Sequence, residues 1–259
     1  MTVVTGRLIC YNTEVIREKR GDTMPKMGQL LMEGKGKRVY ETDDPDAVIV
    51  YFKDEAMAFH GLKRGKILGK GEVNNTVCDH LFTLLEKNGI PTHYIRQIDA
   101  RQSLVKHCEI LPFTVTVRNR VAGSLAARTG LAMGTALDPV VIECNLKDEE
   151  LEDSLINDTH IQAMHLATQE EIRQIYDMAL KINSVLTEYM KEINIELIDF
   201  KLEFGRYHGE IILADEITPD TARFWDSRTH EPLDIDRFRR DLGNVAEAYQ
   251  DVLHRMMGD

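Results

Sequence analysis

Residues Leu197-Ile198-Asp199-Phe200-Lys201-Leu202-Glu203-Phe204-Gly205 are the most regularly patterned stretch of the chain. From Ile198 onward, apolar residues alternate with Asp199, Lys201 and Glu203. Alternation with period two predicts a β-strand that buries its apolar face. Neighbouring charges on the other face would lie about 7 Å apart, since a strand rises about 3.3 Å per residue. Such a face is either an ordinary solvated surface or one that binds a cation or a substrate.

A turn and a second strand are predicted directly after this strand. Residues 205–209 have the composition of a turn, and residues 210–217 that of a strand. Pairing of the two strands as a hairpin would place Asp215 or Glu216 near Asp199. Several carboxylates and Lys201 would then share one small surface, and that concentration of like charge is costly unless a cation or a substrate uses it.

The composition indicates a globular protein. The chain has 259 residues, 43% of them hydrophobic and 29% charged, which is enough for one large domain or two small ones with a buried core. A net charge of −11 argues against general nucleic-acid binding, which needs a basic surface. Local basic clusters in an acidic protein can still bind small anions.

The cysteines and the hydropathy pattern predict a soluble cytoplasmic protein. Cys10, Cys78, Cys108 and Cys144 are widely spaced and form no CxxC pair, so neither a zinc site nor a disulfide framework is indicated. Free thiols are typical of a reducing cytoplasm. No apolar run approaches the roughly 20 residues of a membrane span, and the first residues lack the pattern of a signal peptide.

Secondary structure is predicted along most of the chain. We expect short strands within residues 29–52, 94–98, 103–108 and 111–122, and helices at 72–87, 125–129 and from the Thr168/Glu171 capping box onward. Residues 234–256 are predicted to be mostly helical, with a break at Gly243. We expect an exposed loop at 53–71, a loop at 215–225 and a solvated acidic run at 147–153.

Two segments have the composition of anion sites, and each has a plainer interpretation. Residues 33–38, Glu-Gly-Lys-Gly-Lys-Arg, are either a phosphate-covering loop or a basic hairpin turn. Arg118 and Ser124 bracket the start of the short helix at 125–129. They form either a phosphate nest or a surface arginine and a structural N-cap. Arg223, in the later loop, is a candidate for a second anion contact.

Four motifs together resemble the SAICAR synthetase (phosphoribosylaminoimidazole-succinocarboxamide synthase) family. They are residues 33–40, 117–124, 197–205 and 215–225, and they occur in the family's order and spacing from about Met27 to Met256. The chain departs from the family pattern at Gly36, Thr114 and Ser154. Residues 57–67 are only loosely similar, and residues 1–26 extend beyond the usual start.

The resemblance implies an α+β, two-lobed, ATP-grasp-like fold. An N-terminal extension (1–26) would precede a glycine-rich-hairpin lobe (27–110) with an antiparallel sheet and a larger catalytic lobe (111–259). The implied reaction is ATP-dependent ligation of L-aspartate to carboxyaminoimidazole ribonucleotide through an acyl phosphate, with Mg²⁺ as the metal. It implies small-molecule partners, neither nucleic acid nor membrane, and allows a homodimer.

The resemblance also implies residue roles. Lys35 and Lys37 would cover the ATP phosphates, Lys106 and Cys108 would lie beside the adenine, and Glu203 and Asp215 would hold Mg²⁺ and the ATP. Arg118, Ser124 and Arg223 would bind the ribonucleotide phosphate. Asp199 and Lys201 would act at the imidazole substrate, with Lys147 and Asp153 on a loop beside the aspartate. The simple hairpin register conflicts with these roles, because it places Asp215 nearer Asp199 than Glu203.

Two other functions compete with this ligase. One is an ATP-grasp or kinase-like phosphotransferase that acts on another small acceptor, but such an acceptor needs no grip like that of Arg118, Ser124 and Arg223. The other is a nucleotide-binding regulatory module without chemistry, which would not need both lysines and metal-binding carboxylates.

Overall fold

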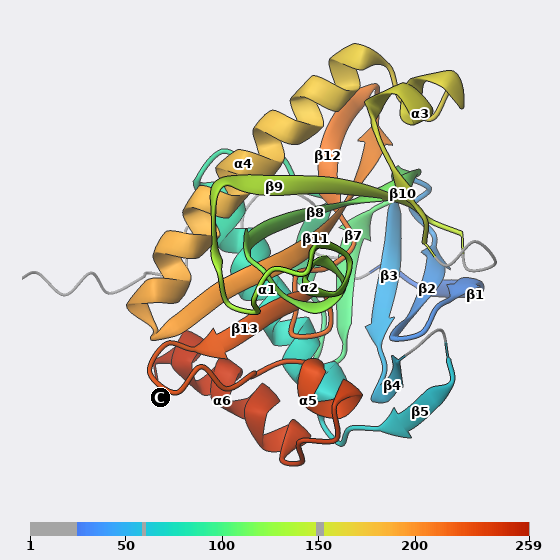
Figure 1. Cartoon of the computed structure of the whole chain (residues 1–259). Helices are drawn as coiled ribbons and strands as arrows, with labels where there is room; N and C mark the ends of the chain where they lie inside the picture. Colours follow the sequence, from blue (N-terminus) through green and yellow to red (C-terminus); the bar gives the residue numbers. More distant parts are fainter. Residues whose placement is uncertain (1–24, 59–60, 149–152, 259) are drawn as a thin grey trace, which may run out of the picture.

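The computed structural model describes residues 25–58, 61–148 and 153–258, and Figure 1 shows them as sheets flanked by helices. The first sheet has the strand order β1 (Met27–Glu33), β2 (Lys37–Thr42), β3 (Ala47–Phe52), β7 (Gln102–Lys106) and β6 (Tyr94–Gln97). The second has the order β10 (Leu155–Ile156), β9 (Ala136–Leu146), β8 (Glu109–Arg120), β11 (Ile195–Tyr207) and β12 (Glu210–Ala214), with β13 (Ala222–Asp226) also paired to β11. Strands β4 (Glu55–Ala58) and β5 (Lys63–Lys66) form a separate pair.

The helices are α1 (Lys70–Lys87), α2 (Gly123–Thr129), α3 (Asp158–Ala163), α4 (Gln169–Glu192), α5 (Asp236–Arg239) and α6 (Val245–Met257). Neighbouring strands in the sheets pair antiparallel. This mixed architecture, with one antiparallel sheet from residues 27–106 and a larger one from 109–226, confirms the predicted α+β class. In the described part of the chain no helix is long and apolar enough to cross a membrane.

The turn between β11 and β12 fixes the register of the second sheet. Tyr207 pairs with Glu210 and Glu203 pairs with Ala214, so the turn consists of His208 and Gly209 alone. Both turn residues have positive φ, 49° and 86°, as a tight two-residue hairpin requires. The predicted five-residue turn is therefore wrong, and so is the expectation that Asp215 returns to Asp199. The ladder places Asp215 beside the Glu203 end of the strand instead.

The alternation predicted for β11 holds from Phe200 to Phe204 but fails at Ile198. Phe200, Leu202 and Phe204 belong to the main core, whereas Ile198 packs with Ala122 and Trp225 in a separate cluster. The cause is a β-bulge, since the pairing of β11 with β13 shifts between Leu197 and Asp199. The bulge turns Ile198 to the opposite face from the main core.

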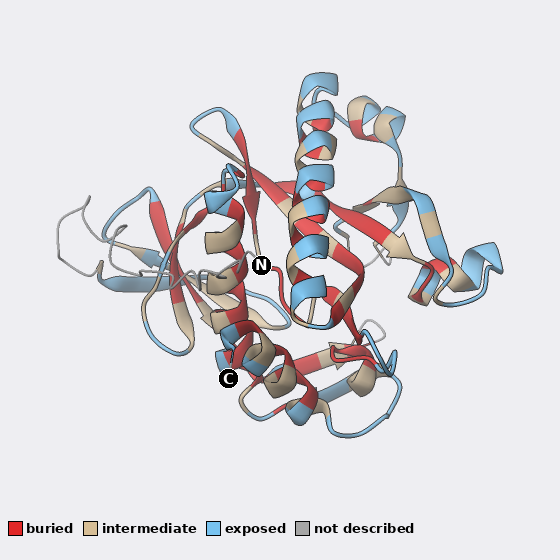
Figure 2. Cartoon of the chain, turned by 90° about the vertical axis from the view of Figure 1, so that its left-hand side faces the viewer, coloured by how far each residue is buried: buried red, intermediate tan, exposed pale blue. Residues whose placement is uncertain are grey.

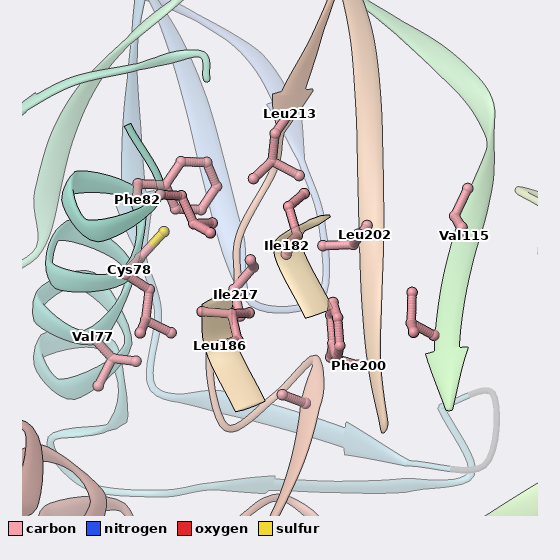
Figure 3. Close-up of a cluster of buried hydrophobic side chains, with 14 of the residues drawn as sticks. Val77, Cys78, Phe82, Val115, Ile182, Leu186, Phe200, Leu202, Leu213 and Ile217 are labelled. Atoms are coloured by element: carbon pink, nitrogen blue, oxygen red, sulfur yellow. The ribbon is translucent and has the colours of Figure 1, made fainter. Parts of the chain in front are cut away.

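The main core lies between the second sheet, α1 and α4. Figure 3 shows Phe200 and Leu202 of β11 and Val115 of β8 facing Ile182 and Leu186 of α4, with α1 contributing Phe82 from the far side. The buried residues of α4 recur every three or four positions, and Figure 2 shows the opposite face of α4 exposed. The predicted Thr168/Glu171 capping box starts this helix.

Backbone hydrogen bonds join the two large sheets at one seam. The amide of His93 donates to the carbonyl of Leu213 (2.8 Å), and the amide of Leu213 donates to the carbonyl of Pro91 (2.9 Å). The backbone amide of Lys106, at the end of β7, donates to the carbonyl of His93 (2.6 Å). The end of β7 and strand β12 are therefore both hydrogen-bonded to the segment 91–93.

Three local predictions are wrong. Residues 53–71 are not an exposed loop, because they include β4 and β5 and because Lys53, Asp54 and Lys70 are buried. Ser124 does not cap α2, whose N-cap is Ala122 without a side-chain bond. The segment 215–225 is a loop only as far as Thr221, after which β13 begins. The predicted extension 1–26 lies almost wholly outside the described residues.

Close packing at the start of α1 gives a stability prediction. A Cβ atom on Gly71 would lie 2.4 Å from the carbonyl oxygen of Phe52, a backbone atom that cannot move aside easily. We expect Gly71→Ala to lower the free energy of unfolding by about 1–3 kcal/mol, measured by urea denaturation. Gly34→Ala is the matched control, because its nearest contact would be an ordinary 3.9 Å. Equal stability of the Gly71→Ala and wild-type proteins would contradict this packing.

Candidate active site

One face of the second sheet carries the candidate site. Strand register places Asp199, Lys201 and Glu203 of β11 opposite Arg118, Thr116 and Thr114 of β8, and places Glu143 and Asn145 of β9 next in line. These eight residues, called the polar face below, lie on the side of the sheet away from the main core. Asp199 is only 3% exposed, so the interpretation of this face as an ordinary solvated surface is wrong at that position.

At one end of the polar face, Asp199 lies between two arginines. Its Oδ2 accepts from Nη1 of Arg118 (2.7 Å), and its Oδ1 accepts from Nη1 of Arg223 (2.9 Å). Nη2 of Arg118 lies 3.3 Å from the hydroxyl of Ser124. Arg118 is 6% exposed, so the interpretation as a surface arginine is wrong. The structure thus brings Arg118, Ser124 and Arg223 together, which we call the arginine end.

Two further carboxylates, missed in the sequence, complete the arginine end. Glu143 accepts from Nε of Arg118 (2.9 Å), and Asp236 accepts from Nε of Arg223 (2.8 Å). Burial would lower the pKa of Arg223, but Asp199 and Asp236 raise it above its usual range. A Cβ atom on Gly123 would lie 2.4 Å from Nη2 of Arg223, so only glycine lets the first turn of α2 approach this guanidinium.

At the other end, carboxylates and lysines are paired. Lys147 forms an ion pair with Glu203, and Lys37 forms ion pairs with Asp215 and with Glu216, the latter at 2.9 Å. We call these five residues the carboxylate end. Since a strand rises about 3.3 Å per residue, the four-residue interval from Asp199 to Glu203 separates the two ends by about 13 Å.

Burial and like charge act on the carboxylate end. Burial raises the pKa of Glu203, and the charge of Asp215 raises it further, which puts these two carboxylates close together. Burial also raises the pKa of Glu216. For Asp215 burial alone would raise the pKa, but the ammonium of Lys37 lowers it below its usual range. Such crowded carboxylates favour a cation between or beside them.

The donor set of the carboxylate end fits Mg²⁺ bound together with phosphates. Among the described residues no group of three acidic, histidine or cysteine side chains could hold a metal ion on its own. Mg²⁺ is commonly bound by only one or two carboxylates, with substrate phosphates and water supplying the other oxygens. Glu203 and Asp215 provide that number of carboxylates and only oxygen donors, so the residues present fit the ion.

The glycine-rich hairpin reaches the carboxylate end from the first sheet. Lys37 begins β2 and contacts Asp215 and Glu216 across the two sheets, whereas Lys35 is exposed at the tip of the hairpin. The sequence had not marked Lys53 as a residue of the site. The ammonium of the buried Lys53 donates to the carboxylate of Glu33 (2.8 Å) and to the carbonyl of Gly34 (3.1 Å), both in the hairpin. The hairpin is therefore anchored over the site.

Lys106 and Cys108 lie where the seam between the sheets meets the turn of β11 and β12. The ammonium of Lys106 donates to the carbonyl of Thr92 (2.7 Å) and lies 5.7 Å from the ring centre of Tyr207. Burial raises the pKa of the Cys108 thiol to about 11, which disfavours a reactive thiolate. The place of Lys106 and Cys108 beside an adenine stays a prediction.

The segment after β9 is linked to the polar face at two points. Lys147 forms an ion pair with Glu203, and the backbone carbonyl of Asp153 accepts from the side-chain amide of Asn145 (2.8 Å). Asp153 has a positive φ of 50°, and its amide donates to the carbonyl of Asp148 (3.0 Å). The rest of the predicted acidic run, residues 149–152, lies outside the described residues. Lys201 has no carboxylate partner among the described residues and lies midway along the polar face.

Comparison with known proteins finds similarity along most of the chain. A family model described as SAICAR synthetase matches residues 30–256. The chain is 52% identical over 231 residues to the phosphoribosylaminoimidazole-succinocarboxamide synthase of Clostridium kluyveri, covering 89% of this chain and 98% of that protein. The crystal structure of the enzyme of that name from Ehrlichia chaffeensis has a TM-score of 0.87 and 40% identity, and the match covers 88% of this chain and 98% of that one. A SAICAR synthetase in complex with ADP has a TM-score of 0.86 and 42% identity, covering 88% and 97%.

The buried Asp234 beside the arginine end predicts a pH dependence of stability. Its carboxylate accepts from the amides of Phe224 (2.8 Å) and Asp236 (2.7 Å), and burial, with the charge of Asp236, raises its pKa to about 7. Between the ordinary pKa of 3.8 and the raised pKa of about 7, the folded state keeps a proton that the unfolded chain has released. This contribution to stability is therefore present at low pH and is lost as the pH rises through about 7. We expect Asp234→Asn to flatten the fall in unfolding free energy between pH 5 and pH 8 in urea titrations. The same slope in both proteins would contradict the raised pKa.

Proposed function

The chain belongs to the SAICAR synthetase family. We propose that it joins L-aspartate to the carboxylate of carboxyaminoimidazole ribonucleotide in a reaction driven by the cleavage of ATP to ADP and phosphate. The products are the succinocarboxamide ribonucleotide, ADP and phosphate. The observation that carries the proposal is the two-ended polar face, with arginines at Asp199 and lysine-paired carboxylates at Glu203. A ribonucleotide with a phosphate at one end and a reactive carboxylate at the other is complementary to it.

The arginine end is proposed to bind the ribonucleotide phosphate. Planar guanidinium groups suit phosphate because they present paired N–H donors. Asp199, Glu143 and Asp236 each bond one edge of Arg118 or Arg223, which aligns the remaining donors. We therefore propose that Asp199 acts by holding the two arginines, rather than on the imidazole as the family resemblance implied.

The carboxylate end is proposed to bind the phosphates of ATP. A carboxylate is a poor electrophile at neutral pH, and transfer of the γ-phosphoryl group to it gives an acyl phosphate with a good leaving group. Phosphoryl transfer depends on alignment and charge neutralisation more than on covalent help from the protein. Glu203 and Asp215 would hold Mg²⁺, which neutralises phosphate charge. Lys35 and Lys37 would bind the phosphates from the hairpin side.

The middle of the polar face is proposed to hold the reacting carboxylate. Lys201 lies between the two ends, where its ammonium can orient that carboxylate toward the phosphates. The amine of L-aspartate then attacks the acyl carbon and phosphate leaves. Lys147, on the segment that also contains Asp153, would lie beside the entering amino acid. We further propose a cytoplasmic enzyme, in keeping with the free thiols of Cys78, Cys108 and Cys144, while the homodimer stays a prediction.

An ADP-release assay tests the proposed function. The purified protein is incubated with Mg·ATP and carboxyaminoimidazole ribonucleotide, with and without L-aspartate. We expect sustained ADP formation only when both the ribonucleotide and L-aspartate are present, accompanied by the succinocarboxamide product. ADP formation that ignores both substrates would overturn the proposal. ADP formation with the ribonucleotide alone, without dependence on aspartate, would favour a phosphotransferase.

Arg118→Lys tests the arginine end. The substitution keeps one positive charge but removes the planar fork that bonds Asp199, Glu143 and Ser124. We expect the KM for the ribonucleotide to rise about ten- to a hundredfold, as expected for loss of a charge-assisted hydrogen bond, while the KM for ATP changes little. Arg206→Lys, at an arginine paired with Glu171 outside the polar face, is the matched control. An unchanged ribonucleotide KM in Arg118→Lys would remove this residue from the phosphate site.

A further inference from the structure

A second ionic cluster lies behind the carboxylate end, at the start of α1. Lys70 is 1% exposed, and its ammonium forms an ion pair with Asp220. The same carboxylate accepts from the side-chain amide of Asn74 (2.8 Å) and from the hydroxyl of Tyr249 on α6 (2.6 Å). Burial would raise the pKa of Asp220, but Lys70 lowers it, so this carboxylate is held in its charged form. We call these four residues the Lys70 cluster.

The Lys70 cluster holds the loop that carries Asp215 and Glu216. The amide of Asp220 donates to the hydroxyl of Thr218 (3.2 Å), and that hydroxyl donates to Oε2 of Glu216 (2.8 Å). Oε1 of Glu216 lies 2.9 Å from Lys37. An unbroken path of polar contacts thus runs from the buried ammonium of Lys70 to the carboxylate end.

The cluster also lies under the glycine-rich hairpin. A Cβ atom on Gly36 would lie 3.7 Å from both Nζ of Lys70 and Oδ2 of Asp220. The position of Lys70 is itself fixed, because the amide of the following Gly71 donates to Asp54 (3.0 Å), which Arg101 also bonds (2.7 Å). The ion pair therefore lies at the meeting point of α1, the hairpin and the 215–221 loop.

Stability alone is a weak explanation for this arrangement. Taking an ammonium and a carboxylate out of water is costly, and a pair of well-packed apolar residues often stabilises a fold equally well. The amide oxygen of Asn74 is buried without a hydrogen-bond partner, so this side chain satisfies Asp220 while leaving its own acceptor unsatisfied. The ionic cluster holds the Asp220 carboxylate in a single orientation. Apolar side chains in the same place would not do so.

We propose that Lys70 is a positioning residue, which through Asp220 fixes residues 215–221 so that Asp215 and Glu216 face the hairpin and the nucleotide phosphates. The proposal rests on the proposed function, because it assigns Lys70 to the ATP side of that site. Because Lys70 is only 1% exposed, we assign it no direct contact with any of the three substrates. Its effect is on the placement of groups that do contact them, and a displacement of about 1 Å at a reacting centre costs about a hundredfold in rate.

The test uses Lys70→Met, which removes the ammonium and keeps the length of the side chain. We expect kcat to fall about tenfold or more, while the KM for the ribonucleotide stays within about twofold because Arg118 and Arg223 are held by other residues. Mg²⁺-dependent binding of ADP, measured by calorimetry, should weaken in parallel. Tyr249→Phe removes one hydrogen bond to the same carboxylate, and we expect a smaller loss in the same direction.

Arg255→Met is the matched control for general destabilisation. It breaks an ion pair between α6 and Asp226 of β13 (2.7 Å). Among the described residues neither Arg255 nor Asp226 bonds a residue of the 215–221 loop, so the variant should lower stability without changing kcat or ADP affinity. Unchanged kcat and ADP affinity in folded Lys70→Met, or an equal kinetic loss in Arg255→Met, would overturn the proposal. If Lys70→Met does not fold, Tyr249→Phe decides by the same two measurements.

The assay also separates this inference from the proposed function. A wild-type protein that does not couple the ribonucleotide and aspartate would refute the proposed function. In that case the ADP-binding arm still tests Lys70, because it needs no acceptor. Wild-type turnover together with unaffected Lys70→Met and Tyr249→Phe variants would refute the inference alone.

Discussion

Strand β11 is paired with β8 from Asp199 to Arg206 on one side, and with β13 and then β12 on the other. Its register therefore determines which side chains meet on the polar face. The two-residue turn at His208 and Gly209 places Asp215 beside Glu203. The partner on that side changes from β13 to β12 between Phe200 and Glu203. A slip of one residue in this strand would exchange core and polar residues along the whole face. The arginine end and the carboxylate end are both consequences of one strand's alignment.

Charge balance constrains the site as strongly as register does. Each carboxylate on the polar face is matched by a cation from another element, so that Arg223 of β13, Lys147 after β9 and Lys37 of β2 all converge on β11 or on the loop after β12. A buried charge without such a partner would be costly. The cations thus fix the relative positions of segments that are distant in the sequence. Two of those cations, Arg223 and Lys37, are also proposed to bind phosphates, so folding and ligand binding use some of the same side chains.

Much of this architecture could be predicted from the sequence, because it depends on local patterns. Alternation at Phe200, Leu202 and Phe204, the capping box at Thr168 and the helix stop at Gly89 are each visible within a few residues. The grouping of Arg118 with Arg223 could be expected only through the family resemblance. What local patterns could not give was the turn length, since residues 205–209 all have turn-like composition and only pairing across the sheet selects His208 and Gly209. Nor could they reveal Lys70 or Lys53, because an isolated lysine in a polar stretch looks solvated until distant carboxylates bury it.

The seam between the sheets constrains how the site can open. His93 and Pro91 are bonded through their backbones to Leu213, only two residues before Asp215. Separation of the glycine-rich hairpin from the polar face must therefore either break these bonds or rotate about them, and rotation preserves the hydrogen bonds. Rotation about the seam would keep Leu213, and the carboxylate end that begins two residues later, close to the axis. Nucleotide exchange by such a rotation would leave Asp215 almost in place and would move chiefly the parts of the first sheet that lie far from the seam.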